Sequence, residues 1–171
     1  MNFDQVMKSR YSVREYQQKP VEDEKIQAIL EAVRLAPTAK NSQPYKLYVA
    51  KTQSALEKMD EVTPNRFGAP VAVLVCGDTD RACILKSNGR NFLETDVSII
   101  QTYMMLKATE LGLGTCWIGR FTPEKVYEVF PVPKNETPFG ILLIGYKSEN
   151  SRPATKHEER LSLDEFVKIL N

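Results

Sequence analysis

Residues 91–111, NFLETDVSIIQTYMMLKATEL, are the stretch that decides the fold of this chain. The pattern predicts a helix whose apolar side chains spread around most of its circumference, as Phe92, Val97, Ile100 and Met104 illustrate. A helix that is apolar nearly all round has to be buried on nearly all sides. A chain of 171 residues provides little protein for this, so we expect a second subunit to cover part of the helix. A central core helix in a monomer is the alternative.

Strands are predicted on both sides of this helix along the chain. Residues 70–76, PVAVLVC, and residues 139–146, FGILLIGY, are continuous apolar runs, which is typical of strands covered on both faces. Shorter strands are expected at residues 45–50 and 115–119. Because helices alternate with these strands, the chain is expected to be α+β or α/β, with helices packed on a sheet.

Capping signals locate the remaining helices. A capping box, in which the N-cap residue and the third helical residue exchange hydrogen bonds, is predicted near each end of the chain. The two boxes are formed by Asn2 with Gln5 and by Ser162 with Glu165. The C-terminal helix is expected to carry Leu163, Phe166, Val167 and Leu170. Between the two boxes, an amphipathic helix is predicted over residues 21–35, and shorter helices after Thr52 and from Pro123.

The composition limits the functions that the chain can have. It contains 23 basic and 22 acidic residues, a net charge of +1, one histidine and three cysteines. The length predicts a single domain over residues 1–171, and the balanced charge argues against nucleic acid as a partner. One histidine excludes a His-cluster site, and the cysteine spacing fits neither a metal site nor an even disulfide framework. We therefore expect no metal and a reducing, cytoplasmic compartment, with no membrane segment.

The first candidate site is residues 10–14, RYSVR. On an extended chain, Arg10, Ser12 and Arg14 share one face because side chains alternate. Two guanidinium groups that flank a hydroxyl are well matched to a phosphate or a carboxylate. Two ordinary solvated arginines are the alternative.

Two further candidates are loops that enter strands. Residues 36–44, APTAKNSQP, form a polar turn whose Asn and Gln amides suit the edge of a heterocycle, although a plain helix C-cap and turn is the alternative. Residues 112–119, GLGTCWIG, lack the glycine spacing of a dinucleotide fingerprint, but they would let a flat group approach the backbone. Trp117 is alternatively a core or interface aromatic. Cys116 is interpreted as an inert buried thiol.

The fourth candidate is a set of basic residues in the polar stretch 147–161. Its members are Lys147, Arg152, Lys156 and Arg160. Alone they indicate a solvated loop, but together with Arg10 and Arg14 they would close a phosphate site from the other end of the chain. His157 lies among charged neighbours and is interpreted as a solvated residue.

Taken in order, these segments resemble the flavin-dependent nitroreductase family over essentially the whole chain. The resemblance is carried by RYSVREY, APTAKNSQPY, the long apolar helix running into LGLGTCWIG, FGILLIGY and the late basic stretch. It implies an α+β fold, with a central mixed or antiparallel sheet flanked by helices. It also implies an intertwined homodimer that binds FMN at the subunit interface and is driven by NADH or NADPH.

The resemblance assigns roles to residues of this chain. It places Arg10 and Ser12, with Tyr11 between them, on the phosphate side of FMN, and Arg14 near the polar edge of the ring, as a possible flavin tuner. The residues matched to the ring and the mouth of the active site are Thr38, Asn41 and Gln43. Those matched to the loop along the ring are Trp117, Ile118 and Gly119. Arg160, with Lys156, matches the late basic position that closes on the phosphate.

The implied chemistry lies on the cofactor, so no side chain is needed as a catalytic acid or base. The hypothesis is alternating transfer, in which NAD(P)H reduces FMN and an acceptor such as a nitroaromatic or a quinone then takes the electrons. One alternative is a specialised flavin reaction on the same fold, such as dehalogenation or dehydrogenation. The other is a flavin-binding sensor or storage module without turnover.

Overall fold

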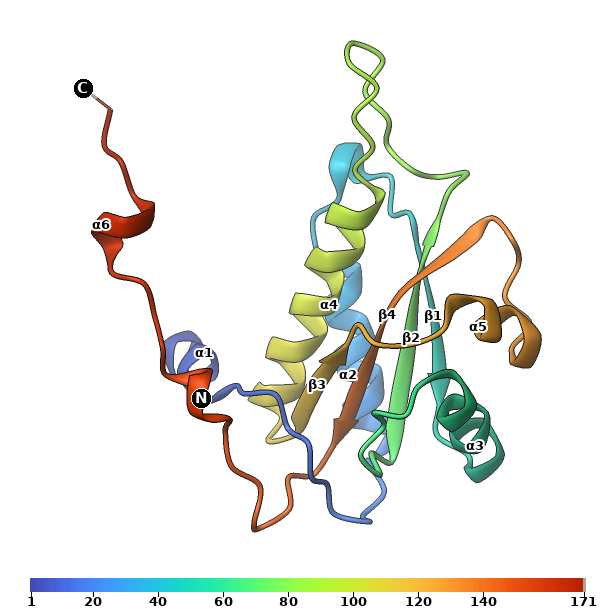
Figure 1. The fold of residues 1–171 in the computed structure, drawn as a ribbon, viewed down its shortest axis with the longest axis vertical. Helices are drawn as coiled ribbons and strands as arrows, with labels where there is room; N and C mark the ends of the chain where they lie inside the picture. Colours follow the sequence, from blue (N-terminus) through green and yellow to red (C-terminus); the bar gives the residue numbers. More distant parts are fainter. Residues whose placement is uncertain (171) are drawn as a thin grey trace.

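The computed structural model describes residues 1–170 and contains a four-stranded sheet with helices on both faces (Figure 1). The strands are Tyr45–Ala50 (β1), Val71–Asp78 (β2), Gly114–Ile118 (β3) and Glu136–Gly145 (β4). They lie in the order β1-β2-β4-β3, and every pair of neighbours is antiparallel. Among the described residues, an isolated bridge between Ser12 and Thr115 is the one parallel pairing. The α+β fold and its four predicted strands are confirmed.

Burial on both faces explains why the central strand β2 is apolar throughout. All 8 of its residues are buried. Its odd-numbered residues up to Val75 pack with α2 (Asp23–Arg34) and α4 (Leu93–Glu110). Its even-numbered residues up to Cys76 pack with α3 (Gln53–Val62) and α5 (Pro123–Val129) on the other face. The sheet is therefore the middle layer between two pairs of helices.

The helices begin where the capping signals predict. Asn2 precedes α1 (Phe3–Ser9), and its Oδ1 accepts a 2.9 Å hydrogen bond from the Gln5 N–H, while Gln5 Oε1 accepts one of 2.9 Å from the Asn2 N–H. Thr52 Oγ1 accepts from the Ala55 N–H at 3.3 Å at the start of α3. These side chains satisfy amide groups that have no partner inside the helix.

Helix α4 is buried where it faces the sheet and α2, and it is partly open on the other side. Ile100 and Met104 are completely covered, whereas Tyr103 is 38% exposed. Together with Phe3 of α1 and Leu106, Tyr103 lines an apolar groove of about 360 Å³ on the open side. One protomer therefore leaves part of this helix uncovered. The expectation of a second subunit depends on such an uncovered surface.

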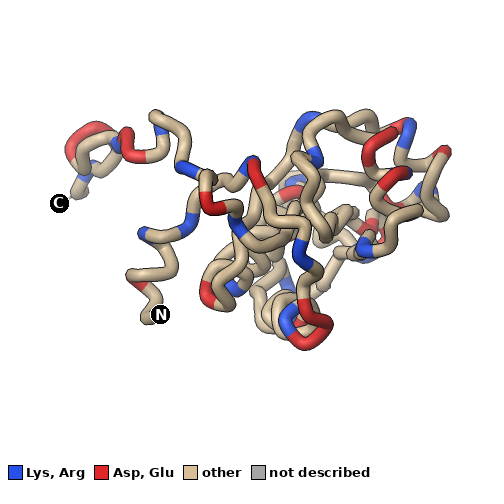
Figure 2. Tube along the Cα trace, turned by 90° about the horizontal axis from the view of Figure 1, so that it is seen from below, with Lys and Arg blue, Asp and Glu red and all other residues tan. Residues whose placement is uncertain are grey.

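The C-terminal arm, residues 152–170, runs away from the sheet and its helices (Figures 1 and 2). Its helix α6 (Leu163–Phe166) has 4 residues, so the expectation of a longer helix that includes Val167 and Leu170 is wrong. Phe166 is 62% exposed and Leu170 is 92% exposed. Because a helix this short depends on packing for its stability, it ends where no core supports the next turn.

Strand β2 continues beyond the apolar run predicted over residues 70–76, and a polar stretch up to residue 90 follows it. Gly77 and Asp78 extend β2, because they continue its pairing with β4. A bridge between Ile84 and Asn91 closes the remainder into a narrow hairpin, which projects beyond the sheet at the top of Figure 1.

The N-terminal segment, residues 10–18, is bound along the sheet by backbone hydrogen bonds. The Val13 N–H donates to the Thr115 carbonyl at 2.8 Å, and the Gln17 N–H donates to the Tyr146 carbonyl at 2.9 Å. The Val13 side chain is completely buried. The path of the segment that carries the first candidate site, residues 10–14, is therefore determined by the core of the protomer.

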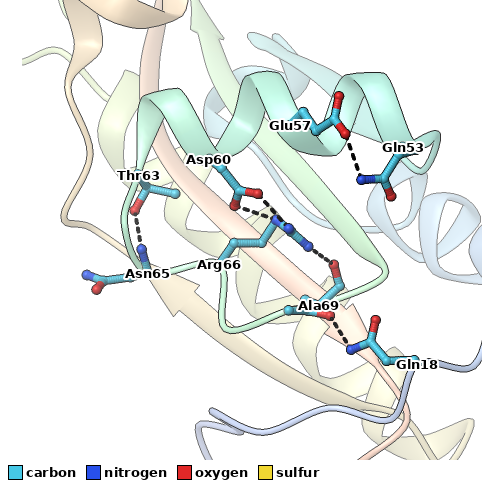
Figure 3. A network of polar contacts seen from close by, with 9 residues as sticks. Gln18, Gln53, Glu57, Asp60, Thr63, Asn65, Arg66 and Ala69 are labelled. Carbon is cyan, nitrogen blue, oxygen red and sulfur yellow. Dashed lines mark hydrogen bonds and ion pairs between the residues drawn. The ribbon is translucent and has the colours of Figure 1, made fainter.

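Arg66 joins α3 to the turn before β2, and Gln18 joins the end of the N-terminal segment to the same turn (Figure 3). Its guanidinium donates two 2.6 Å hydrogen bonds to the Asp60 carboxylate and one of 2.9 Å to the Ala69 carbonyl. Gln18 Nε2 donates to the Gly68 carbonyl at 3.2 Å. The paired, fork-shaped contact of an arginine with a carboxylate holds both groups in one orientation, so this network fixes the turn before β2 and the segment that touches it.

Candidate functional site

The N-terminal segment and the C-terminal arm meet at a cavity of about 190 Å³, which we call the cationic cavity. Its lining residues are Tyr11, Ser12, Arg14, Ala154, Lys156 and His157. Ser12 and Arg14 reach it together because alternate side chains of an extended segment share a face. Lys156 and His157 come from a 3₁₀ turn, Thr155–His157, in the arm. None of the described residues that line this cavity is acidic.

The two basic side chains of the cavity have few partners. Arg14 Nη1 donates to the Ser12 carbonyl over 3.4 Å, which is a long hydrogen bond. None of the ion pairs within residues 1–170 involves Lys156. Figure 2 shows basic residues on both the segment and the arm where the two run close together. A guanidinium and an ammonium group without carboxylate partners favour binding of an anion.

Arg10 and Arg160, which were predicted beside the phosphate, do not line the cationic cavity in this protomer. Arg10 is the C-cap residue of α1. Arg160 Nη1 donates to the backbone carbonyls of His157 and Glu159. Of the two late basic residues left open by the sequence, the structure brings Lys156 to the cavity.

The interpretation of His157 as a solvated residue is wrong. Its side chain is half-buried, and its ring lies 6.1 Å from the Tyr11 ring, measured between centroids. This contact joins opposite ends of the chain, so no local pattern signals it. The one available clue is its place next to Lys156, which the resemblance had already selected.

Thr38, Asn41 and Gln43 lie in a tight loop between α2 and β1. The Gln43 N–H donates to Thr38 Oγ1 at 3.1 Å, and Gln43 Nε2 donates to Asn41 Oδ1 at 3.2 Å. Lys40, Asn41 and Gln43 have φ angles of 52°, 53° and 49°, in the left-handed region that L-residues rarely occupy. Asn41 and Gln43 are exposed, so the loop presents amide groups at a cost in backbone strain.

Asp96, which sequence reasoning missed, holds this loop from inside the protein. Its Oδ1 accepts a 2.9 Å hydrogen bond from the Ala39 N–H, and its side chain is 1% exposed. Its Oδ2 is buried without a partner among the described residues. A signal was present, because an acidic residue stands in the helix whose apolar pattern predicts burial on nearly all sides.

Two of these residues, Trp117 and Ile118, are the last residues of β3, and Gly119 follows the strand. Trp117 is half-buried and packs with the core on the α2 and α4 side, whereas Ile118 belongs to the core on the opposite face. A Cβ at Gly140 would lie 2.7 Å from Trp117 Nε1 and 2.9 Å from Gln101 Oε1. The indole therefore occupies space that exists because residue 140 is a glycine.

Cys116, in the same strand, is 3% exposed. Burial raises the pKa of its thiol above the ordinary value. A thiol that resists ionisation is a poor nucleophile, which agrees with its interpretation as inert.

The predicted site residues do not form one cluster in a single protomer. The 38–43 loop contacts Asp96 in the first turns of α4, whereas Ser12 pairs with Thr115, which follows the other end of that helix. With 18 residues, α4 is about 27 Å long. The loop and the cationic cavity therefore lie toward opposite ends of α4 (Figure 1).

Membrane-spanning helices and clusters of metal-ligating side chains are both absent from the described residues. Within residues 1–170, no helix has the length and the apolar character needed to cross a membrane. In the same part of the chain, His, Cys, Asp and Glu side chains form no group of three or more that could hold a metal ion.

Comparison with known proteins places these features in a family. The pattern of the Nitroreductase family matches residues 7–69 and 64–146. A Bacillus subtilis protein named FMN reductase (NAD(P)H) is 31% identical over 182 residues, covering 91% of this chain and 73% of its own. A nitroreductase family protein from Clostridium difficile 630 has a crystal structure that matches with a TM-score of 0.91 and 40% identity, covering 98% of both chains. An FMN-dependent nitroreductase from Clostridium difficile R20291 matches with a TM-score of 0.78 and 28% identity, covering 97% of this chain and 98% of its own.

Proposed function

The chain belongs to the nitroreductase family, and on this premise we propose that it is an NAD(P)H-dependent flavin oxidoreductase with FMN as its cofactor. Its acceptor in this proposal is a small oxidant such as a nitroaromatic or a quinone. The names of the similar proteins support both FMN and NAD(P)H. The observation that carries the proposal is the cationic cavity, where Ser12, Arg14 and Lys156 meet without an acidic neighbour.

The donor set of this cavity fits the phosphate of FMN. A phosphate monoester carries a charge of roughly −1.5 to −2 near neutral pH and has three strong acceptor oxygens. Arg14 and Lys156 supply positive charge, and the Ser12 hydroxyl supplies a further donor. An extended segment backed by the buried Val13 holds Ser12 and Arg14 in place before any ligand binds.

The side chains of this protein bind and orient, and bound FMN supplies the ring that accepts hydride from NAD(P)H and passes electrons to the acceptor. Because Arg14 lines the cavity that we assign to the phosphate, its role in this proposal is phosphate binding, in place of the contact with the polar edge of the ring that the resemblance implies. The exposed amides of Asn41 and Gln43 are candidates for hydrogen bonds to the polar edge of the ring. The half-buried Trp117 and the exposed Gly119, which follows β3, are candidates for the surface along which the ring lies.

We further infer that two copies of the chain form an intertwined homodimer, with the flavin at their interface. The separation of the 38–43 loop from the cationic cavity supports this, because a second copy can bring its own loop to the cavity. The uncovered face of α4 around Tyr103 and the exposed apolar side chains of the C-terminal arm support it as well. Apolar surface of this kind marks an interaction site.

An absorbance spectrum followed by anaerobic titration with NADPH tests the proposed function. We expect the protein to bind FMN, to bleach its visible absorbance with NADPH, and to regain it when a quinone is added. Protein that stays colourless with added FMN contradicts the proposal. Flavin that binds but is reduced far more slowly than metabolism requires favours a sensor or storage role.

Variants of two arginines locate the binding site. Arg14→Ala should weaken FMN binding by roughly tenfold, the effect of one charge-assisted contact. Arg152→Ala is the matched control, because Arg152 donates to the carbonyls of Glu149 and Ser151 and does not line the cavity. Equal affinities in the two variants would remove Arg14 from the site.

A further inference from the structure

We propose that His157 is an anion-binding residue of the cationic cavity, and that its imidazolium form contacts the phosphate of FMN. The inference rests on the proposed function and adds a third basic group to the two that the cavity already holds. It concerns the one histidine of the chain, so its protonation can be observed without overlap from other imidazoles.

The N-terminal side of the cavity holds the His157 ring against Tyr11. The two rings meet edge to face, at 65° and 6.1 Å between centroids. Tyr11 is itself fixed, because its hydroxyl bonds to the backbone and side-chain oxygens of Ser151 at 3.3 and 3.2 Å and Lys147 Nζ lies 4.5 Å from its ring centre. Arg14 is the other charged group on this side. The imidazole is therefore placed by aromatic packing, which leaves its nitrogen atoms available to a ligand.

The arm closes the other side of the cavity around the same ring. The His157 N–H donates to the Ala154 carbonyl at 2.8 Å, and Arg160 Nη1 bonds to the His157 carbonyl, so the turn is pinned through its backbone. Lys156 lines the cavity next to His157. Glu158 and Glu159 follow in the chain, but both are exposed and neither lines the cavity. No hydrogen bond within residues 1–170 involves an imidazole nitrogen of His157.

The chemistry of the imidazole and of the phosphate predicts how the contact between them changes with pH. Histidine gains a proton in the range between pH 5 and 8, and a doubly protonated ring donates from both nitrogens. The contact is therefore strongest in the acidic part of this range and is lost as the pH rises and the ring becomes neutral. The second ionisation of the phosphate acts in the opposite direction, but it acts equally on every variant of the protein.

Binding of two flavins at several pH values tests the proposal. Dissociation constants for FMN and for riboflavin, which lacks the phosphate, are measured by flavin fluorescence between about pH 5.5 and pH 8.5, the range of histidine titration. The wild-type protein should bind FMN about three- to tenfold more tightly than His157→Gln at the acidic end, as expected for one partly solvated charge-assisted contact. This advantage should vanish at the alkaline end. Riboflavin should bind equally to both proteins at every pH.

Two further variants separate the contribution of His157 from that of its neighbours. His157→Lys should restore tight FMN binding and make the advantage independent of pH, because an ammonium stays charged throughout the range. Lys168→Gln should keep the pH dependence of the wild type, because Lys168 is an exposed cation of the arm that does not line the cavity. Circular dichroism confirms that each variant is folded.

NMR gives a readout that does not depend on the variants. The single pair of imidazole C–H resonances should titrate at a higher pH with FMN present than without it, and riboflavin should leave the titration unchanged. If wild type and His157→Gln bind FMN with the same pH profile and the resonances do not respond, the proposal for His157 fails while the proposed function stands. If no variant and no pH gives FMN binding, the proposed function fails as well.

Discussion

The N-terminal segment and the C-terminal arm supply the two walls of the cationic cavity, and the protomer holds them by very different contacts. In the segment, Val13 and Tyr16 are 0% and 6% exposed, and backbone hydrogen bonds join the segment to the sheet. In the arm, Phe166 and Leu170 are 62% and 92% exposed, and Arg160 bonds to carbonyls of its own neighbours.

This difference shows that folding of one chain determines the position of the segment but leaves the position of the arm to its contacts with another chain. Folding of the protomer builds the segment into the core, because burial of its apolar side chains stabilises that path by roughly 25 cal/mol for each Å² removed from water. The arm retains its apolar surface, so the same free energy is still available for an association. The first wall of the cavity is therefore preformed, and the position of the second depends on what covers the arm.

The largest effect on protomer stability is expected from a change that pushes the segment off the sheet. A Cβ at Gly114 would lie 2.7 Å from Val13 Cγ2 and 2.9 Å from Lys147 Cγ. Gly114→Ala should therefore lower the free energy of unfolding by about 1–3 kcal/mol, measured by urea denaturation. Gly119→Ala is the control, because nothing lies within 4 Å of its added Cβ. Equal stability of the two variants would show that the segment is not packed as described.

A smaller loss of stability is expected from a change in the 38–43 loop, which is held by the buried Asp96 in the way that the segment is held by the core. Asp96→Ala removes the acceptor of the Ala39 N–H and should cost about 1 kcal/mol, because losing a buried carboxylate offsets part of the penalty. The exposed Lys40 lies in this loop, so trypsin should cleave after it faster in the variant. Asp96→Asn keeps an acceptor oxygen and should protect the loop. Cleavage at the wild-type rate in Asp96→Ala would mean that the loop is held by other contacts.

The smallest effect on protomer stability is expected in the arm. Phe166→Glu should change the free energy of unfolding by less than about 0.5 kcal/mol in protein dilute enough to be monomeric, as for an exposed position. At micromolar concentration, sedimentation should instead show a loss of dimer, because a charge replaces buried apolar surface. Phe166→Leu is the control and should retain the dimer. A Phe166→Glu variant that sediments like the wild type would exclude this side chain from the interface.

The secondary structure was largely predictable from the sequence because its signals are local. Asn2 and Gln5 form the capping box that their spacing indicates, and the apolar runs of β2 and β4 became the buried centre of the sheet. The C-terminal helix shows the limit of such signals. Glu165 accepts hydrogen bonds from the Ser162 N–H and hydroxyl as predicted, yet the helix ends at Phe166 because its apolar side chains find no core in the protomer.

The candidate site was predictable only where the backbone is extended. Alternation along the segment predicted a face formed by Arg10, Ser12 and Arg14. Of these, Ser12 and Arg14 line the cavity, together with Tyr11, which strict alternation would place on the other face. The choice of Lys156 over Arg160 and the presence of His157 depend on a contact between opposite ends of the chain, which no local pattern encodes. The separation of the 38–43 loop from the cavity follows from the length of α4, so it too becomes visible only in three dimensions.

The left-handed backbone at Lys40, Asn41 and Gln43 has a consequence for engineering this protein. Each non-glycine residue in that conformation costs about 1–2 kcal/mol, and glycine would adopt it without strain. Selection for heat resistance alone would therefore enrich glycine at these positions and erase the amides that the loop displays. Under the role proposed for the amides of Asn41 and Gln43, stability and activity would compete at these two positions, so libraries aimed at a robust catalyst should hold both constant.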